Sequence, residues 1–256
     1  MSGGRVVHEF ANKDDLCEAL GEYVERIANS AIAQRNRFVV SVSGGSLPSQ
    51  LGSARLLKAQ TDWSRWHVLY SDERFVPLND ADSNHALTQA SFLSRVPIPA
   101  ANVHTLHYDA SAGVDAAARA YEAELESLFG ATDEHASHSD GVVEVDLVLL
   151  GMGPDGHTAS LFPGHALLAE RERLIAPIAD SPKPPPQRIT FTYPLINAAR
   201  NVAFVATGAA KQPALREIFE SPDCPLPAAL VRPATPVVWF VDADAVGWPR
   251  ATPAAL

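Results

Sequence analysis

One short stretch of the chain combines residues suited to acid–base chemistry. Residues 149–164 read LLGMGPDGHTASLFPG and place a carboxylate, Asp155, two positions before an imidazole, His157. Imidazole is the side chain whose ordinary pKa lies near neutrality, and a carboxylate at this spacing can orient it or face the same substrate. The glycines around the pair permit positive φ and close approach to a ligand. The stretch predicts a general base on a loop, and the alternative is an incidental surface histidine on a turn.

Polar groups also follow two other apolar runs. RFVVSV (37–42) leads into Ser43 and then Gly44, Gly45 and Ser46, and WHVLYS (66–71) leads into Asp72, Glu73 and Arg74. A strand, a Gly-Gly turn and a helix direct backbone N–H groups toward an anion. The turn is neither a Walker loop nor a GxGxxG fingerprint. Without further context, a plain turn and a solvated charged loop are the alternatives.

Two cationic residues further along the chain lie at positions where a bound anion would account for a positive charge. Lys211 falls in the first turn of a helix expected over 209–220. The helix dipole disfavours a cation there unless an anion is bound in front of it, and a solvent-facing lysine is the alternative. Arg188 begins the alternating strand RITFTY, directly after the segment 180–187, whose four prolines exclude regular structure.

The elements that must position these residues alternate between apolar runs and helical patterns. This alternation predicts an α/β fold, a doubly wound, mostly parallel, Rossmann-like sheet, in a single domain over 1–256. In such a sheet, polar groups that follow different strands can converge at the carboxyl edge. A helix over 14–36, capped by Asn12 or Asp14, should open the fold. Further helices are expected over 47–60, 83–95, 112–129 and 209–220. Strands are expected over 37–42, 66–71, 103–107, 142–150, 174–178, 188–193, 201–207 and 237–241.

Composition excludes several classes of function. The 256 residues carry a net charge of -10, which disfavours general binding to nucleic acid or anionic membranes. Two cysteines far apart in sequence give neither a disulfide framework nor a zinc knuckle. His135 and His138, in the polar stretch 130–141, lack partners at metal-ligand spacing, so no metal is expected. There is no secretory h-region and no apolar stretch of membrane-spanning length, so we expect a soluble, cytoplasmic protein.

Taken together, several motifs resemble a known family. VSVSGGSLPSQL, YSDERFVPLNDADSNH, LLGMGPDGHTASLFPG, SPKPPPQRITFTYPLIN and TGAAK occur in this order. In combination they resemble 6-phosphogluconolactonase, within the superfamily of glucosamine-6-phosphate deaminase and ribose-5-phosphate isomerase. The resemblance runs from about Phe10 to Val241. It implies hydrolysis of 6-phospho-D-glucono-1,5-lactone to 6-phosphogluconate, the second step of the oxidative pentose phosphate pathway, with no metal and no cofactor.

The resemblance also implies roles for individual residues. His157 is the expected general base, and Asp155 is expected to orient it or to hold the substrate. The 6-phosphate is expected to bind at the turn Gly44–Gly45–Ser46, Arg188 and Lys211. Asp72 and Arg74 are expected to line the same substrate pocket. The partner is then a small phosphorylated sugar lactone, and we expect a monomer.

Rival functions differ from this one at identifiable residues. The deaminase pattern typically has a glutamate five residues past the histidine, for ring opening, and here that position is Phe162. A non-catalytic sugar-phosphate sensor would keep the phosphate residues but need not keep His157. No helix-turn-helix precedes the domain, and the negative charge is wrong for DNA. A serine hydrolase is excluded by the lack of a GxSxG elbow.

Overall fold

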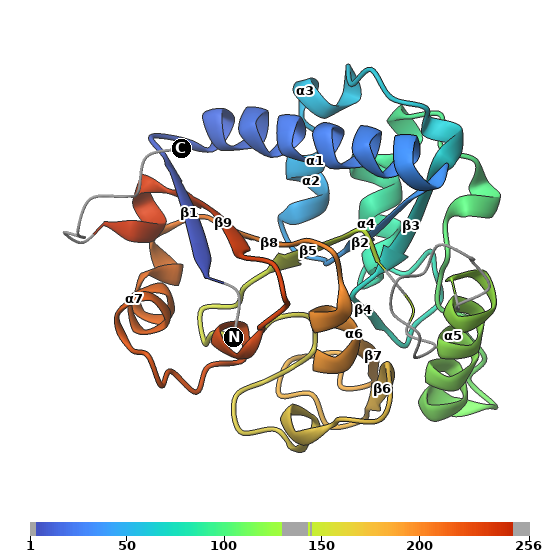
Figure 1. Cartoon of the computed structure of the whole chain (residues 1–256). Helices are drawn as coiled ribbons and strands as arrows, with labels where there is room; N and C mark the ends of the chain where they lie inside the picture. Colours follow the sequence, from blue (N-terminus) through green and yellow to red (C-terminus); the bar gives the residue numbers. More distant parts are fainter. Residues whose placement is uncertain (1–3, 130–142, 144, 248–256) are drawn as a thin grey trace.

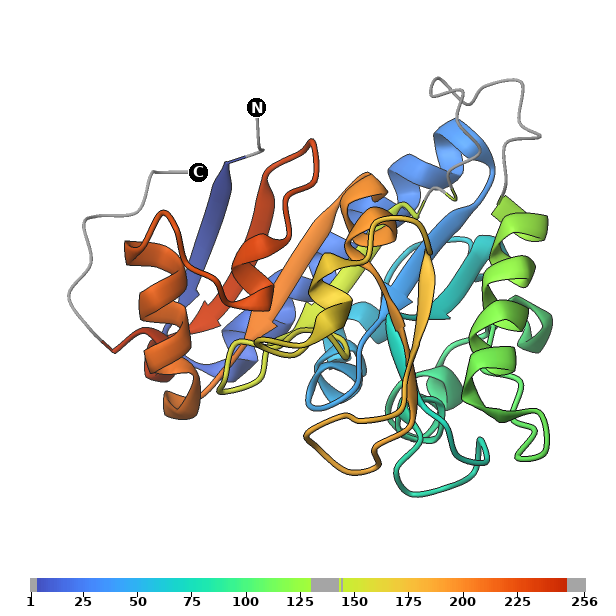
Figure 2. The ribbon, with the colours of Figure 1, turned by 90° about the horizontal axis from the view of Figure 1, so that it is seen from below.

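A parallel sheet of six strands forms the centre of the computed structural model, which describes residues 4–129, 143 and 145–247 (Figure 1). Every neighbouring pair in the order β1-β9-β8-β5-β2-β3 is parallel. The predicted fold class, an α/β protein with a mostly parallel doubly wound sheet, is therefore confirmed. Figure 2 shows these strands side by side, from β1 in blue to β3 in teal. Their bounds are β1 Arg5–Phe10, β2 Phe38–Val42, β3 Trp66–Tyr70, β5 Leu147–Gly151, β8 Val202–Ala206 and β9 Val237–Asp242.

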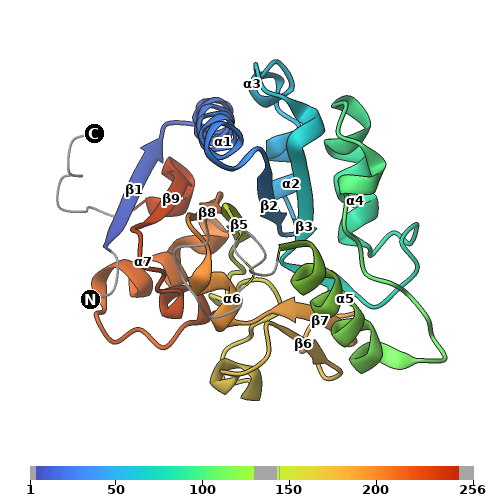
Figure 3. The same ribbon diagram turned by 45° about the vertical axis from the view of Figure 1, so that its right-hand side comes forward.

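Hydrophobic cores cover both faces of this sheet. Along β5, Leu147 and Leu149 pack into one core, and Val148 and Leu150 pack into the other. This follows from the two-residue period of a strand, and it explains why the central strands are continuous apolar runs. Helices α1 to α3 pack on the first face, and α5 to α7 pack on the second (Figures 1 and 3). The helices are α1 Lys13–Arg35, α2 Leu47–Leu51, α3 Ala54–Leu57, α4 Asn84–Ser91, α5 Gly113–Phe129, α6 Tyr193–Ala198 and α7 Gln212–Glu220.

A small antiparallel sheet continues from the carboxyl edge of the main one. Its strands are β4 (Asp72–Arg74), β7 (Arg188–Phe191) and β6 (Ile175–Ile178), in that order. Ser71 joins the two sheets, because its N–H donates to the carbonyl of Val42 and its carbonyl accepts from the N–H of Phe191. The alternative interpretation of residues 72–74, a solvated charged loop, is wrong, because the structure makes them a strand.

Several expected elements differ in extent from those observed. Residues 103–107 form no strand, since only an isolated bridge joins Val103 to Val68. The helix expected over 47–60 is divided into α2 and α3 at Gly52. The helix expected over 83–95 ends at Ser91 and gives way to a short 3-10 turn. Strand β1 was not predicted, because it mixes polar with apolar residues and is partly exposed, so it shows no apolar run.

Two helix starts agree with the sequence. The side chain of Asn12 accepts a hydrogen bond from the N–H of Asp15, and that of Ser83 accepts from Ala86, which satisfies N–H groups that lack intrahelical partners. No helix among the described residues is long and apolar enough to cross a membrane. The stretch 130–141, with His135 and His138, lies outside the described residues. The single-domain organisation stays a prediction.

Candidate active site

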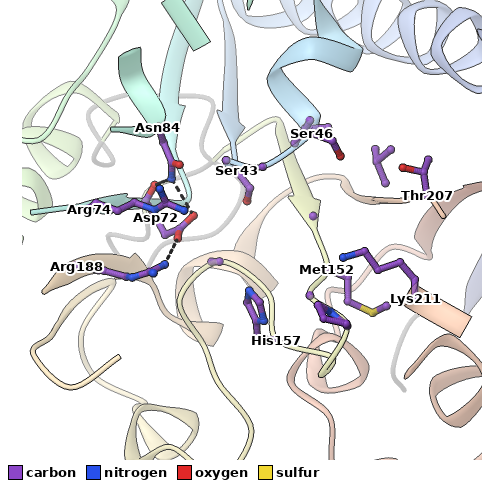
Figure 4. Close-up of a pocket in the computed structure, with 18 residues that line it drawn as sticks. Ser43, Ser46, Asp72, Arg74, Asn84, Met152, His157, Arg188, Thr207 and Lys211 are labelled. Carbon is purple, nitrogen blue, oxygen red and sulfur yellow. Dashed lines mark hydrogen bonds and ion pairs between the residues drawn. The ribbon is translucent and has the colours of Figure 1, made fainter. Parts of the chain in front are cut away.

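A polar cavity of about 240 Å³ opens where β2, β3, β5 and β8 end (Figure 4). Because these strands are parallel, their carboxyl ends meet at one edge, where ligands of open α/β sheets bind. The volume is below the range typical of drug-sized ligands, so a small polar molecule fits it best. The side chains and turns around it come from distant segments. They include Ser43, Gly44, Gly45, Ser46, Asp72, Arg74, Asn84, Gly151, Met152, Gly153, His157, Ala159, Arg188, Thr207 and Lys211.

The loop after β5 holds His157 at the mouth of the cavity. Backbone hydrogen bonds close the loop, from the N–H of Gly153 to the carbonyl of His157 and from the N–H of Gly156 to the carbonyl of Gly153. Gly156 has φ of +78°, which a side chain would strain. A Cβ at Gly153 would overlap the ring of His157. Glycine is therefore required at 153 so that the imidazole can fold back over the loop.

Asp155 orients the imidazole directly. Its Oδ1 lies 2.5 Å from Nδ1 of His157, which leaves Nε2 as the second ring nitrogen. Burial lowers the pKa of His157, whereas the hydrogen bond and charge of Asp155 raise it. Burial raises the pKa of Asp155, but His157 and Lys183 outweigh this and bring it to about 2. A neutral imidazole beside an ionised carboxylate is the arrangement that general-base catalysis requires.

A buried aromatic ring packs against the imidazole of His157. The ring centroid of Phe162 lies 4.8 Å from that of His157, and Phe162 is 1% exposed. Cζ of Arg188 lies 5.7 Å from the centroid of the same phenyl ring. The position where the deaminase pattern has a glutamate is thus filled by a side chain that cannot transfer a proton.

Arg188 and Asp72 are both buried and lie close together. Nη1 of Arg188 is 4.0 Å from Oδ2 of Asp72, and the hydroxyl of Ser160 donates to that same oxygen at 2.8 Å. The side chain of Arg188 also donates to the backbone carbonyls of residues 183, 184 and 185. Burial lowers the pKa of Arg188, and the charge of Asp72 raises it. Arg188 therefore fixes the proline-rich loop as well as facing the cavity.

Glu73 organises the wall of the cavity on the side of Asp72 and Arg188. Its buried carboxylate accepts hydrogen bonds from the backbone N–H groups of Arg74, Asn84 and His85 and from the hydroxyl of Ser83. These bonds join β4 to the start of α4, where Asn84 in turn donates to the carbonyl of Asp72. The acidic motif thus builds the wall that carries Arg74.

Lys211 lies on the other side of His157 from Arg188 in Figure 4. It belongs to the 3-10 turn Ala209–Lys211 that precedes α7, rather than to the first turn of the helix. Burial lowers the pKa of Lys211, and the neighbouring charges that act on it are Lys183 and Asp155. The charges acting on Arg188 are Asp72, Arg74, Asp82 and Glu73. The cavity is therefore flanked by separate cationic groups on its two sides.

Buried polar atoms without partners mark where a ligand would bind. Among the described residues, Oγ of Ser43, Nε of Arg74 and Oδ1 of Asn84 are buried, lack a hydrogen-bond partner, and belong to residues that line the cavity. Leaving such groups unpaired is costly. A polar ligand with both donors and acceptors would satisfy them.

The structure brings the predicted site residues together. Gly44, Gly45, Ser46, Asp72, Arg74, His157, Arg188 and Lys211 all line the cavity, and Asp155 contacts His157. Their individual roles stay predictions.

Three further residues of the site were not predicted. Asn84 and Ser160 contact Asp72, and Lys183 contacts His157. All three fall inside motifs that carry the family resemblance, which is the signal that could have found them. The described part of the chain contains no cluster of three or more His, Cys, Asp or Glu side chains suited to a metal.

Comparison with known proteins shows the family of this chain. The model of the family described as glucosamine-6-phosphate isomerases/6-phosphogluconolactonase matches residues 11–239. The chain belongs to this family. It is 43% identical over 245 residues to a Rattus norvegicus 6-phosphogluconolactonase, covering 93% of this chain and 91% of the rat protein. It is 44% identical over 246 residues to a Homo sapiens 6-phosphogluconolactonase, covering 93% and 91% of the two chains.

A solved family member shares the fold. The 6-phosphogluconolactonase from Trypanosoma brucei superposes with a TM-score of 0.81 at 26% identity, covering 95% of this chain and 98% of the other. A monomeric glucosamine-6-phosphate deaminase has a TM-score of 0.73 at 18% identity, covering 94% of this chain and 98% of the other. That second likeness concerns the fold alone. Within the family, the chemistry must therefore be argued from the site.

Proposed function

We propose that this family member hydrolyses 6-phospho-D-glucono-1,5-lactone to 6-phospho-D-gluconate. The observation that carries the proposal is the pair Asp155–His157, held on a glycine loop in a cavity flanked by cations. A lactone is an activated ester, so a positioned water and a base are sufficient for its hydrolysis. No metal and no cofactor take part in the proposed reaction.

His157 acts as the general base at Nε2. It takes a proton as water attacks C1, and Asp155 stabilises the imidazolium that results. The C1–O5 bond then breaks, and the imidazolium returns its proton to O5. General-base catalysis supplies about 10²–10⁴ in rate. Nε of Arg74, buried without an acceptor, can donate to the negative charge that develops on the carbonyl oxygen.

The 6-phosphate binds at the turn Gly44–Gly45–Ser46, with Arg188 on one side and Lys211 on the other. Backbone N–H groups and charged side chains make the strongest hydrogen bonds to phosphate oxygens. Holding the phosphate uses binding energy to position the ring over His157. Local cations are needed because the whole chain carries a net charge of -10.

The deaminase reaction is disfavoured at one position. Phe162 packs on His157 where that chemistry needs a carboxylate. A sensor without catalysis would have no need of an oriented base beside its phosphate site. Cytoplasmic location and a monomeric state remain parts of this proposal.

A coupled assay tests the proposal. Freshly made 6-phosphogluconolactone is mixed with the protein, and the NADPH formed by added 6-phosphogluconate dehydrogenase is followed against an enzyme-free blank. We expect a rate well above the blank and no ammonia from glucosamine 6-phosphate under the same conditions. A rate equal to the blank, or release of ammonia, would contradict the proposal.

A further inference from the structure

Lys183 bridges the two residues of the proposed acid–base pair from outside the cavity. Its Nζ lies 3.2 Å from each carboxylate oxygen of Asp155 and 3.1 Å from Nδ1 of His157. The side chain is 38% exposed, and Lys183 is not among the residues that line the cavity. It therefore contacts the catalytic pair from a position that does not line the cavity.

The loop that carries Lys183 is fixed on both sides. The hydroxyl of Ser181 donates to the carbonyl of Lys183 and accepts from its N–H. The buried guanidinium of Arg188 donates to the carbonyls of Lys183, Pro184 and Pro185. Prolines restrict the backbone further. The backbone of Lys183 is thus held where its ammonium reaches Asp155.

The contacts of Asp155 indicate where the protons lie. Nδ1 of His157 and Oδ1 of Asp155 are 2.5 Å apart, a distance that two acceptors without a proton between them would not adopt. The proton therefore lies between them, with Nδ1–H as the donor. An ammonium has donors only, so Lys183 donates to the carboxylate. Its 3.1 Å approach to the protonated Nδ1 brings two donors together and is not a hydrogen bond. Nε2 is left with its lone pair, as a base requires.

The charges around the imidazole act in opposite directions. Asp155 favours the protonated ring, and Lys183 opposes it, as does burial. Asp72 is the other charged group that acts on His157, and it also favours protonation. Phe162 packs on the ring and carries no charge. The charges that act on Lys211 are those of Lys183 and Asp155. Lys183 is thus the cation that offsets the carboxylate.

We propose that Lys183 is a positioning residue that holds Asp155 against His157 and offsets the carboxylate's charge, so that the imidazole stays neutral and base-competent. This inference rests on the proposed function of His157 as the base. Without Lys183, its charge would no longer oppose those of Asp155 and Asp72, which favour the imidazolium. A smaller fraction of the enzyme would then be active on the acid side of neutrality.

The variants Lys183→Met and Lys183→Arg test this, with Lys58→Met as the control. Lys58 is exposed at the end of α3 and does not line the cavity, so its variant loses the same charge without touching the site. The ¹⁵N NMR signals of His157 are followed against pH in each protein. In parallel, kcat/KM for the lactone is measured across pH 5.5–8, about the range in which an imidazole titrates, with the enzyme-free rate subtracted.

In Lys183→Met we expect His157 to titrate at higher pH than in the unmodified protein. The acid limb of kcat/KM should move the same way, so that the loss is several-fold larger at the acid end than at the alkaline end. In Lys183→Arg, the titration of His157 and the acid limb of kcat/KM should both return most of the way to those of the unmodified protein. Lys58→Met should change neither the titration nor the acid limb. An unchanged titration with a uniform loss at every pH would overturn the inference, as would a rise in KM alone. If the unmodified protein had no lactonase activity, the proposed function would fail, but the titration would still test Lys183.

Discussion

At the residue scale, the proposed reaction depends on one proton between Asp155 and His157. The 2.5 Å contact places a proton between the two atoms, and the lowered pKa of Asp155 assigns it to Nδ1, which leaves Nε2 free to act as the base. Phe162 holds the ring by packing, and charges of opposite sign act on it. The base is thus prepared before any substrate binds, which reduces the reorganisation needed during the reaction.

Replacing Asp155 by asparagine should affect both orientation and charge. Asp155 raises the pKa of His157, so its loss should move the acid limb of kcat/KM to lower pH, opposite to the effect expected for Lys183→Met. We also expect kcat to fall about a hundredfold, because the ring loses its orientation and the imidazolium its counter-ion. A pH series of initial rates measures both effects. An acid limb that moves to higher pH would contradict the proposed balance of charges.

Lys211→Ala should separate phosphate binding from catalysis. Lys211 lines the cavity, and its loss removes a charge–phosphate contact. We expect KM for the phosphorylated lactone to rise at least about tenfold, the effect of roughly 1.4 kcal/mol of lost binding, with a smaller change in kcat. Glucono-1,5-lactone, which has no phosphate, serves as the comparison substrate. Equal losses on both lactones would argue against a phosphate contact. Arg188→Ala is less informative, because Arg188 also holds the proline-rich loop.

At the scale of elements, the buried strands were predictable and the polar ones were not. β2, β5 and β8 are short, mainly apolar strands that are buried on both faces, a pattern the sequence displays directly. β4 consists of Asp72, Glu73 and Arg74, and it forms because Glu73 and Asp72 find buried partners from α4 and the loop after β5. Such pairings join segments that are far apart in the chain, so no local sequence pattern predicts them.

The site was predictable to a similar degree. His157 and Asp155 stand out by type and spacing, and the resemblance supplies Arg188 and Lys211. Lys183 could not be ranked from sequence, because its contact with Asp155 requires the fold of the proline-rich loop. Prolines indicate the absence of regular structure, but they do not say where a side chain will point.

The loop after β5 gives an element-scale prediction. Gly153→Ala should leave the fold intact but displace His157, since the new Cβ would overlap the imidazole. A displacement of this kind costs on the order of a hundredfold in kcat. Gly4→Ala, whose Cβ meets nothing within 4 Å, is the control. Circular dichroism and thermal melting check the folding. Normal turnover in Gly153→Ala would show that the close packing of ring on loop is unimportant.

At the scale of the whole molecule, the sheet edge assembles a positive site within a negatively charged chain. The net charge is -10, whereas Arg74, Arg188 and Lys211 line one cavity and Lys183 contacts the histidine of that cavity. Parallel strands make this possible, because their carboxyl ends bring segments that are far apart in the chain to one edge. The cations act at short range, where they outweigh the adverse mean field.

Chelation tests the metal-free mechanism at this scale. Because the proposed reaction uses His157 and water alone, prolonged treatment with EDTA should leave kcat/KM unchanged within error. Catalysis by a bound metal would contribute several kcal/mol to the reaction, so its removal would be obvious. A loss of activity that added Mg²⁺, Mn²⁺ or Zn²⁺ restores would contradict the mechanism.

The most direct test of the central claim is the single-turnover and steady-state rate of His157→Asn on fresh 6-phosphogluconolactone. Asparagine retains a polar side chain but cannot accept the proton, so we expect kcat to fall at least about a hundredfold while KM changes little. The unmodified protein is the reference, and thermal melting confirms that the variant is folded to the same degree. Turnover within a few-fold of that reference would show that the base is some other group, and the proposed role of His157 would be wrong.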